Sequence, residues 1–131
     1  MLPGVTKHVV VGVDDDFRIR ESIARLVESA GHTPVLFSSA EALLQSGALA
    51  ETACLITDVR MPGMDGLELQ RRIRIEYPKL PVIFVSGHVD DEIRRRALDG
   101  GAVDFMYKPF DGADLLRVID LALNRSSNDP V

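Results

Sequence analysis

Tryptophan is absent from the sequence, cysteine occurs once, and no hydrophobic run is long. The single cysteine, Cys54, cannot form a disulfide within the chain, and its place in an apolar run predicts a small buried side chain in a reducing compartment. The apolar runs are too short to span a bilayer, and residues 1–7 lack the apolar segment and cleavage site of a secretory signal. We therefore expect a cytoplasmic protein without membrane contact.

Basic charge is also in deficit. The chain has 15 Lys and Arg against 20 Asp and Glu, which gives a net charge of -5 at pH 7. Nucleic-acid binding normally requires a basic surface that displaces counterions, so we expect no direct nucleic-acid binding by this segment. The 131 residues are 46% hydrophobic and fit a single globular domain. We place that domain at residues 1–125 and expect 126–131 to be a C-terminal tail or the start of a linker.

Five apolar runs alternate with segments of helical periodicity. The first run, at residues 9–13, is continuous and rich in β-branched residues, which is typical of a strand buried on both faces of a parallel sheet. The five runs lie at residues 9–13, 33–37, 53–57, 82–85 and 103–107. Strands that alternate with helices predict right-handed crossovers and an α/β fold. We expect the flavodoxin-like doubly wound (βα)5 fold, with a five-stranded parallel sheet in the order 2-1-3-4-5.

Capping residues mark where several of the predicted helices begin. Asp16, Asp90 and Asp111 can each accept a hydrogen bond from a backbone amide in the first turn of a helix. Ser38 with Glu41 has the spacing of a capping box, which predicts the start of a short helix that ends near residue 47. From Arg125 onward we expect a frayed tail.

Carboxylates follow two of the predicted strands. Asp14 and Asp15 come directly after the first strand, and Asp58 follows the third. The expected strand order makes these two strands neighbours, so their carboxyl ends deliver the three side chains to one edge of the sheet, where open α/β folds bind ligands. The fourth and fifth strands would add Ser86 and Lys108 to the same edge. The sequence thus predicts a small acidic pocket.

The chemistry of this pocket follows from its charges. Neighbouring carboxylates repel each other by roughly 4 kcal/mol for a pair about 4 Å apart at an effective dielectric constant of about 20. Hard oxygen ligands with access to water suit Mg²⁺, and Lys108 offers a second positive charge. A phosphoryl group could be held by these cations, and Asp58 is the best candidate to attack its phosphorus. The product, an aspartyl phosphate, hydrolyses readily, which suits a transient signal.

Taken together, four motifs resemble the receiver domain of two-component response regulators, over nearly the whole chain. They are Val13-Asp14-Asp15-Asp16, Thr57-Asp58-Val59-Arg60-Met61-Pro62-Gly63-Met64-Asp65-Gly66, Val85-Ser86-Gly87-His88, and Gly101-Ala102-Val103-Asp104-Phe105 with Lys108-Pro109-Phe110. The motif that begins at Gly101 is similar to regulators of the nitrogen-fixation type. The resemblance implies a switch that is phosphorylated and dephosphorylated, and not a turnover enzyme.

The resemblance implies a role for each pocket residue. Asp58 would accept phosphate from a sensor histidine kinase or a histidine phosphotransfer protein. Asp15 would ligate Mg²⁺ together with Asp58 and the backbone carbonyl of Arg60, and Asp14 would do so mainly through water. The metal site would therefore share its acidic residues with the phosphoacceptor.

Further implied roles concern the switch itself. Ser86 would follow the phosphoryl group while Lys108 binds it, and the Lys108–Pro109 bond would be cis. Phe105 is similar to an aromatic switch residue that is often tyrosine, so its signalling would be steric. The basic run at residues 94–96 would belong to a partner or homodimer surface on the fourth helix, fifth strand and fifth helix. A solvated face is the plain alternative for this run.

From the residues alone, other functions stay open. The acids at residues 14–16 could be solvated side chains at a strand end, and Asp58 could be an ordinary loop acid. A receiver-like interaction module could signal without phosphate. A metal-dependent small-molecule phosphatase is less favoured, because its Asp-x-Asp motif needs an acid where Arg60 stands. A flavin carrier is disfavoured by the acidic pocket and the few aromatic residues. No motif names the kinase, the stimulus or the output.

Overall fold

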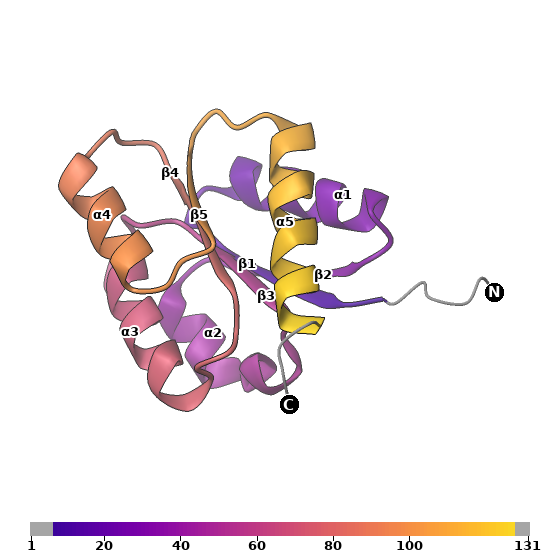
Figure 1. Cartoon of the computed structure of the whole chain (residues 1–131), viewed down its shortest axis with the longest axis horizontal. Helices are drawn as coiled ribbons and strands as arrows, with labels where there is room; N and C mark the ends of the chain where they lie inside the picture. Colours follow the sequence, from indigo (N-terminus) through magenta and orange to yellow (C-terminus); the bar gives the residue numbers. More distant parts are fainter. Residues whose placement is uncertain (1–6, 128–131) are drawn as a thin grey trace.

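A computed structural model describes residues 7–127, in which five strands alternate with five α-helices (Figure 1). The elements, in chain order, are β1 (Val9–Val13), α1 (Phe17–Ser29), β2 (Thr33–Phe37), α2 (Ala40–Ser46), the 3-10 helix η1 (Ala48–Glu51), β3 (Cys54–Thr57), α3 (Gly66–Glu76), β4 (Val82–Ser86), α4 (Asp91–Asp99), β5 (Asp104–Tyr107) and α5 (Gly112–Ser127). The predicted α/β class is confirmed, and each predicted strand agrees with the observed one to within one residue at its ends.

The five strands form one parallel sheet in the order β2-β1-β3-β4-β5, which is the predicted doubly wound arrangement. The register pairs Val13 with Thr57 across β1 and β3. It pairs Ser86 with Tyr107 across β4 and β5. These pairs lie at the carboxyl ends of their strands, so the residues that follow them emerge next to one another at the same edge of the sheet.

Helices cover both faces of the sheet (Figure 1). Helices α1 and α5 pack on one face, and α2, α3 and α4 pack on the other. Neighbouring residues of a strand point to opposite faces, so Val10 packs with the first group of helices and Val11 with the second. Cys54 is fully buried, as predicted, and burial raises the pKa of its thiol to about 12.

Aspartate side chains cap the N-termini of several helices. Asp16, Asp65 and Asp90 each accept a hydrogen bond from a backbone amide in the first turn of the helix that follows. Asp111 accepts in the same way from the amide of Ala113 at 2.8 Å. The caps predicted at residues 16, 90 and 111 are therefore confirmed, because each side chain satisfies an amide that has no partner within its helix.

The capping box predicted at Ser38 is wrong. Helix α2 begins one residue later than this motif implies, and Ser39 is its cap, accepting from the amide of Ala42 at 3.1 Å. Glu41 does not reach back to the start of the helix. Its carboxylate accepts from the amide of Met64, in the loop after β3. A contact 23 positions away in the chain has replaced the local one.

The last helix is longer than expected. Helix α5 ends at Ser127, so the predicted frayed tail from Arg125 begins inside a helix, and residues 128–131 lie outside the described residues. The Lys108–Pro109 peptide bond before α5 is cis, as the resemblance implied. Within residues 7–127, the structure contains no helix that is long and apolar enough to cross a membrane.

A substitution at Gly66, the first residue of α3, tests how closely this helix packs against the loop after β3. A β-carbon on Gly66 would clash with the backbone carbonyl oxygen of Asp58 and lie 3.0 Å from Phe84 Cε1. We expect Gly66→Ala to lower the free energy of unfolding by about 1 to 3 kcal/mol, although helix propensity favours alanine, because this backbone oxygen cannot move aside. Urea unfolding monitored by circular dichroism measures this loss.

Gly87→Ala is the matched control, because a β-carbon there meets nothing closer than 3.8 Å. Its stability should stay within about 0.5 kcal/mol of the wild type. Equal stability of the two variants would show that the close approach between α3 and Asp58 is not a constraint.

Candidate functional site

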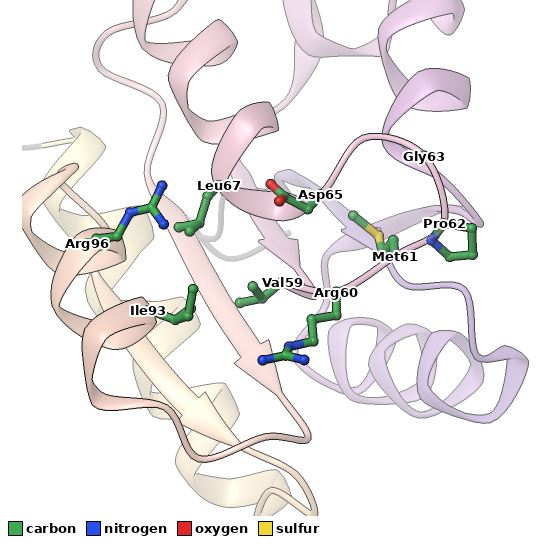
Figure 2. A pocket seen from close by; sticks show the side chains of 9 residues that line it. All are labelled: Val59, Arg60, Met61, Pro62, Gly63, Asp65, Leu67, Ile93 and Arg96. Carbon is green, nitrogen blue, oxygen red and sulfur yellow. The ribbon is translucent and has the colours of Figure 1, made fainter.

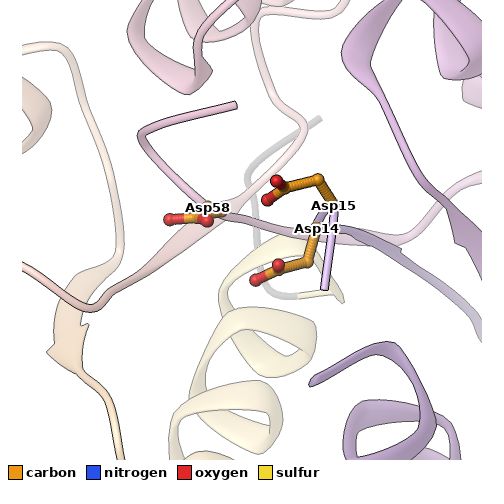
Figure 3. A group of neighbouring side chains, drawn as sticks. All are labelled: Asp14, Asp15 and Asp58. Carbon is orange, nitrogen blue, oxygen red and sulfur yellow. The ribbon is translucent and has the colours of Figure 1, made fainter. Parts of the chain in front are cut away.

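The strand ends bring three carboxylates together at one edge of the sheet. The register of β1 and β3 places Asp14 beside Asp58, whose amide donates to the carbonyl of Val13 at 3.0 Å. Ligand oxygens of Asp14, Asp15 and Asp58 lie within 4.8 Å of one another (Figure 3). Asp14 and Asp58 are buried, and Asp15 is exposed. The predicted acidic cluster therefore exists, with Asp15 on its solvent side.

Lys108 follows β5, and its ammonium group contacts two of these carboxylates. Nζ lies 2.8 Å from Oδ2 of Asp14 and 3.2 Å from Oδ2 of Asp58. The lysine side chain is only 17% exposed, so solvent screens these contacts weakly. Burial by itself lowers the pKa of Lys108, but the hydrogen bonds and charges of the two aspartates outweigh it and raise that pKa above its ordinary value. Lys108 is therefore a fixed cation at neutral pH.

The surroundings of Asp58 favour the neutral form of its side chain more than water favours that of a free aspartate. Burial raises its pKa most, and the nearby charge of Asp14 raises it further. Lys108 opposes this shift, as does the amide of Val59, which donates to Oδ1 of Asp58 at 2.7 Å. Because the net shift is upward, the ionised carboxylate is destabilised in this site, and an added cation would stabilise it.

Asp14 is held in place by contacts on both its side chain and its backbone. Oδ1 accepts from the amide of Asp16 at 2.9 Å, and the carbonyl accepts from a guanidinium nitrogen of Arg20 at 2.8 Å. The same guanidinium lies over the ring of Phe17, 5.7 Å from its centre. Sequence reasoning missed Arg20, because no motif indicates that a side chain in α1 turns back to the loop before it.

The donor set of the cluster suits a hard divalent cation. Three carboxylates and one ammonium leave two formal negative charges at the sheet edge. The side-chain ligand atoms of the cluster are all carboxylate oxygens, which Mg²⁺ prefers, and the exposed position of Asp15 allows the ion to keep waters. The residues present therefore fit the ion that the sequence predicted.

Ser86 and Phe105 lie near the site but form no hydrogen bond with the carboxylate of Asp58. The buried Ser86 hydroxyl is 3.2 Å from both the amide and the carbonyl of exposed His88, in a local turn. The Ser86 carbonyl accepts from the amide of Lys108 at 2.7 Å. Phe105 is buried and stacks on Phe84, with ring centres 5.9 Å apart. The backbone thus links Ser86 to Lys108, while Phe105 is part of the core.

The side chain of Arg60 lies outside the carboxylate cluster. Its guanidinium is 3.8 Å from the carboxylate of Asp90, at the start of α4. Arg60 also lines a cleft of about 600 Å³ between the loop after β3 and α4, in which Ile93 and Arg96 come from the helix (Figure 2). The guanidinium of Arg60 is therefore paired outside the cluster, and the role of its backbone carbonyl as a ligand stays a prediction.

A doubly wound parallel sheet with clustered carboxylates and a lysine at its carboxyl edge defines the class of receiver-like α/β domains. The family model described as response regulator receiver domain matches residues 10–120, and this chain belongs to that family. The match includes β2 to β5 in full, β1 from its second residue, and α5 up to residue 120. The resemblance found in the four sequence motifs is therefore confirmed at the level of the family.

Individual relatives support the same assignment. Nodulation protein W of Bradyrhizobium diazoefficiens is 42% identical over 120 residues, which cover 92% of this chain and 53% of that protein. The transcriptional regulatory protein FixJ of Azorhizobium caulinodans is 40% identical over 115 residues, which cover 88% of this chain and 54% of that protein. This chain thus spans about half the length of these relatives. The similarities place it near FixJ-type regulators.

A solved structure shows the same fold. The CheY-like response regulator receiver domain of Methanospirillum hungatei superimposes with a TM-score of 0.88 at 25% sequence identity. The alignment covers 95% of this chain and 100% of that one. The architecture of the family is therefore reproduced over nearly the whole chain.

Removing the negative charge of Asp58 should stabilise the metal-free protein. Because the pKa of Asp58 is raised on folding, its ionised form opposes folding above that pKa, and this penalty disappears as the pH falls and Asp58 is protonated. We expect Asp58→Asn to unfold with about 1 to 3 kcal/mol more free energy than the wild type at pH 7 in EDTA. The difference should shrink toward zero below the ordinary pKa range of carboxyl groups.

Urea titrations between pH 3 and pH 8 measure this dependence. Asp120→Asn, at an exposed position of α5, is the control and should change stability by less than about 0.5 kcal/mol. A metal-free Asp58→Asn protein that is less stable than the wild type at pH 7 would contradict the electrostatic description of the site.

Proposed function

We propose that this domain is the phosphoacceptor of a two-component phosphorelay and that Asp58 accepts the phosphoryl group. The observation that supports this most directly is the position of buried Asp58, 3.2 Å from the ammonium of Lys108 and within the cluster formed with Asp14 and Asp15. A carboxylate can attack a phosphoryl group only where positive charge offsets the repulsion between the two anions. Lys108 supplies such a charge at contact distance.

The donor would be a phosphohistidine of a sensor histidine kinase or of a histidine phosphotransfer protein. An oxygen of Asp58 attacks the phosphorus and forms an O–P bond. The P–N bond breaks, and its electron pair stays on the imidazole nitrogen, which then takes up a proton. Lys108 stabilises the negative charge of the phosphoryl oxygens during this transfer. Attack of water on the same phosphorus later releases inorganic phosphate and restores the Asp58 carboxylate.

Mg²⁺ would be held by Asp15, Asp58 and the backbone carbonyl of Arg60, with Asp14 bound mainly through water. When bound there, the ion neutralises phosphoryl oxygens as a Lewis acid. The convergence of three carboxylates within 4.8 Å supports this ligand set. The 2.8 Å contact between Asp14 and Lys108 agrees with a less direct role for Asp14, because Lys108 already contacts one of its oxygens.

The switch would run from Ser86 to the surface of α4, β5 and α5. Phosphorylation would draw the Ser86 hydroxyl away from His88 and toward the phosphoryl oxygens. This movement would change the space beside Phe105, which lacks a hydroxyl and would respond through packing alone. The exposed arginines at residues 94–96 of α4 would then form part of a surface for a partner or for a homodimer.

The output of the switch is also part of the proposal. The chain spans about half the length of its relatives, one of which is named a transcriptional regulatory protein, so an output segment or a separate partner would read the switch surface. The domain would occupy residues 1–125, and residues 126–131 would lead out of it as a tail or linker. With a net charge of -5, this segment is unsuited to bind nucleic acid directly.

Intact mass spectrometry after incubation with acetyl phosphate tests the acceptor. We expect the wild-type chain to gain one phosphoryl group in the presence of Mg²⁺ and to gain none in EDTA. Asp58→Asn should gain none, because an amide oxygen is a poor nucleophile, and Asp120→Asn should behave as the wild type. The modification should be lost on mild alkaline treatment, as expected of an acyl phosphate.

Two results would contradict the proposal. A folded wild-type chain that gains no phosphoryl group would favour an interaction module that signals without phosphate. Release of phosphate from small phosphorylated metabolites, without any phosphorylated protein, would favour a metal-dependent phosphatase.

A further inference from the structure

The loop between β3 and α3 carries both the acceptor and a proposed metal ligand. It runs from Asp58 to the start of α3 and includes Arg60. At its base, the amide of Gly66 donates to the carbonyl of Val59 at 2.8 Å, which closes the loop. The outer part, residues 60–64, lies beyond this bond. Its position therefore depends on contacts with the rest of the molecule.

Glu41, in the first turn of α2, provides such a contact. Its Oε2 accepts from the amide of Met64 at 2.8 Å. The preceding residue, Gly63, has a φ of 80°, and a β-carbon at this position would clash with Oε2 of Glu41. The carboxylate therefore packs directly against the loop backbone, at the residue without a side chain. This contact joins α2 to the outer part of the loop.

The other oxygen of this carboxylate is not satisfied. Oε1 of Glu41 is buried and has no hydrogen-bond partner within residues 7–127. A buried acceptor without a partner reduces stability, so packing alone does not explain a glutamate here. The hydrogen bond from Met64 lowers the pKa of Glu41 most, its own backbone amide and the charge of Arg72 act in the same direction, and together they outweigh burial, which raises this pKa. The group is therefore a carboxylate at neutral pH.

We propose that Glu41 is a positioning residue for phosphoryl transfer: its carboxylate fixes the loop that presents the Arg60 carbonyl to the cation. This inference rests on the proposed function. The path from Glu41 to the site is short, because Met64 lies four positions after Arg60, and Val59, which precedes Arg60, donates its amide to the acceptor carboxylate at 2.7 Å. Residues that orient metal ligands typically contribute about 10- to 100-fold to metal affinity.

A purely structural role for Glu41 predicts a different result. If the contact only joined α2 to the loop, its loss would lower the stability of the metal-free and Mg²⁺-bound protein by similar amounts. If the contact positions the loop, its loss also lowers the affinity of the folded protein for Mg²⁺. Stabilisation by Mg²⁺ then requires a higher concentration of the ion, because stabilisation by a ligand is set by the ratio of its concentration to its Kd.

The experiment compares Glu41→Ala, Glu41→Gln and, as a control for the lost charge, Glu51→Ala at an exposed position of η1, all in the 131-residue chain. Mg²⁺ titrations are monitored by the amide NMR shifts of residues 58–64 and by thermal unfolding. Phosphorylation by acetyl phosphate is then measured over the same Mg²⁺ series. The first two readouts do not depend on the reaction.

We expect Glu41→Ala to need about tenfold more Mg²⁺ for half-saturation than the wild type. Glu41→Gln should stay within about threefold, because its amide oxygen still accepts from Met64. Glu51→Ala should match the wild type. Gly63→Ala, whose new methyl group displaces the Glu41 carboxylate, should also raise the half-saturating Mg²⁺ concentration, and it provides a second test if Glu41→Ala does not fold.

Unchanged Mg²⁺ affinity in folded Glu41→Ala or in Gly63→Ala would overturn this inference. Equal losses in Glu41→Gln and Glu41→Ala would also overturn it, because the charge and not the bond to the loop would then matter. A wild-type chain that neither binds Mg²⁺ nor gains a phosphoryl group would instead contradict the proposed function. A failure confined to the Glu41 and Gly63 variants contradicts only the positioning role.

Discussion

Two buried carboxylates, Asp14 and Asp58, share the ammonium group of Lys108 at the carboxyl edge of the sheet. The fold has to keep Lys108 beside these two acids, because burying either acid without a cation would be strongly destabilising. The contact requires the ends of β1, β3 and β5 to be held in fixed positions, and the strand order with β1 beside β3 achieves this. The two apolar cores under the helices supply the rigidity, and the edge of the sheet holds the charges.

The site is electrostatically incomplete without a further cation. Lys108 balances one negative charge, while burial and Asp14 keep the pKa of Asp58 above its ordinary value. A site that disfavours its own ionised carboxylate gains more from a bound divalent ion than a solvated site does, and under the proposed function the same ion would offset the charge of an incoming phosphoryl group. The acidity that would repel an anionic substrate is thus also what attracts the cation that permits its approach. The loop that Glu41 contacts matters to both effects, because it carries the proposed acceptor and a proposed metal ligand.

Much of the fold was predictable from the sequence because the central strands at residues 9–13 and 53–57 are apolar runs, which have few alternatives to a buried parallel sheet. The expected strand order alone was enough to predict that Asp14 and Asp58 lie close together. The failure at the start of α2 has a different cause: Ser39 caps the helix locally, and Glu41 does not complete a capping box because it contacts Met64, in a loop 23 positions away. Local patterns contain no information about such packing.

The most direct test of the acceptor role is to trap the phosphoryl linkage chemically. After phosphorylation by a purified histidine kinase with Mg²⁺, borohydride reduces an acyl phosphate to the corresponding alcohol, and peptide mass spectrometry identifies the modified residue. If Asp58 is the acceptor between Lys108 and the acidic cluster, the reduced residue will be at position 58, with no reduced residue in the untreated protein. Reduction at another aspartate, or a stable phosphate on a serine or histidine, would contradict the central claim.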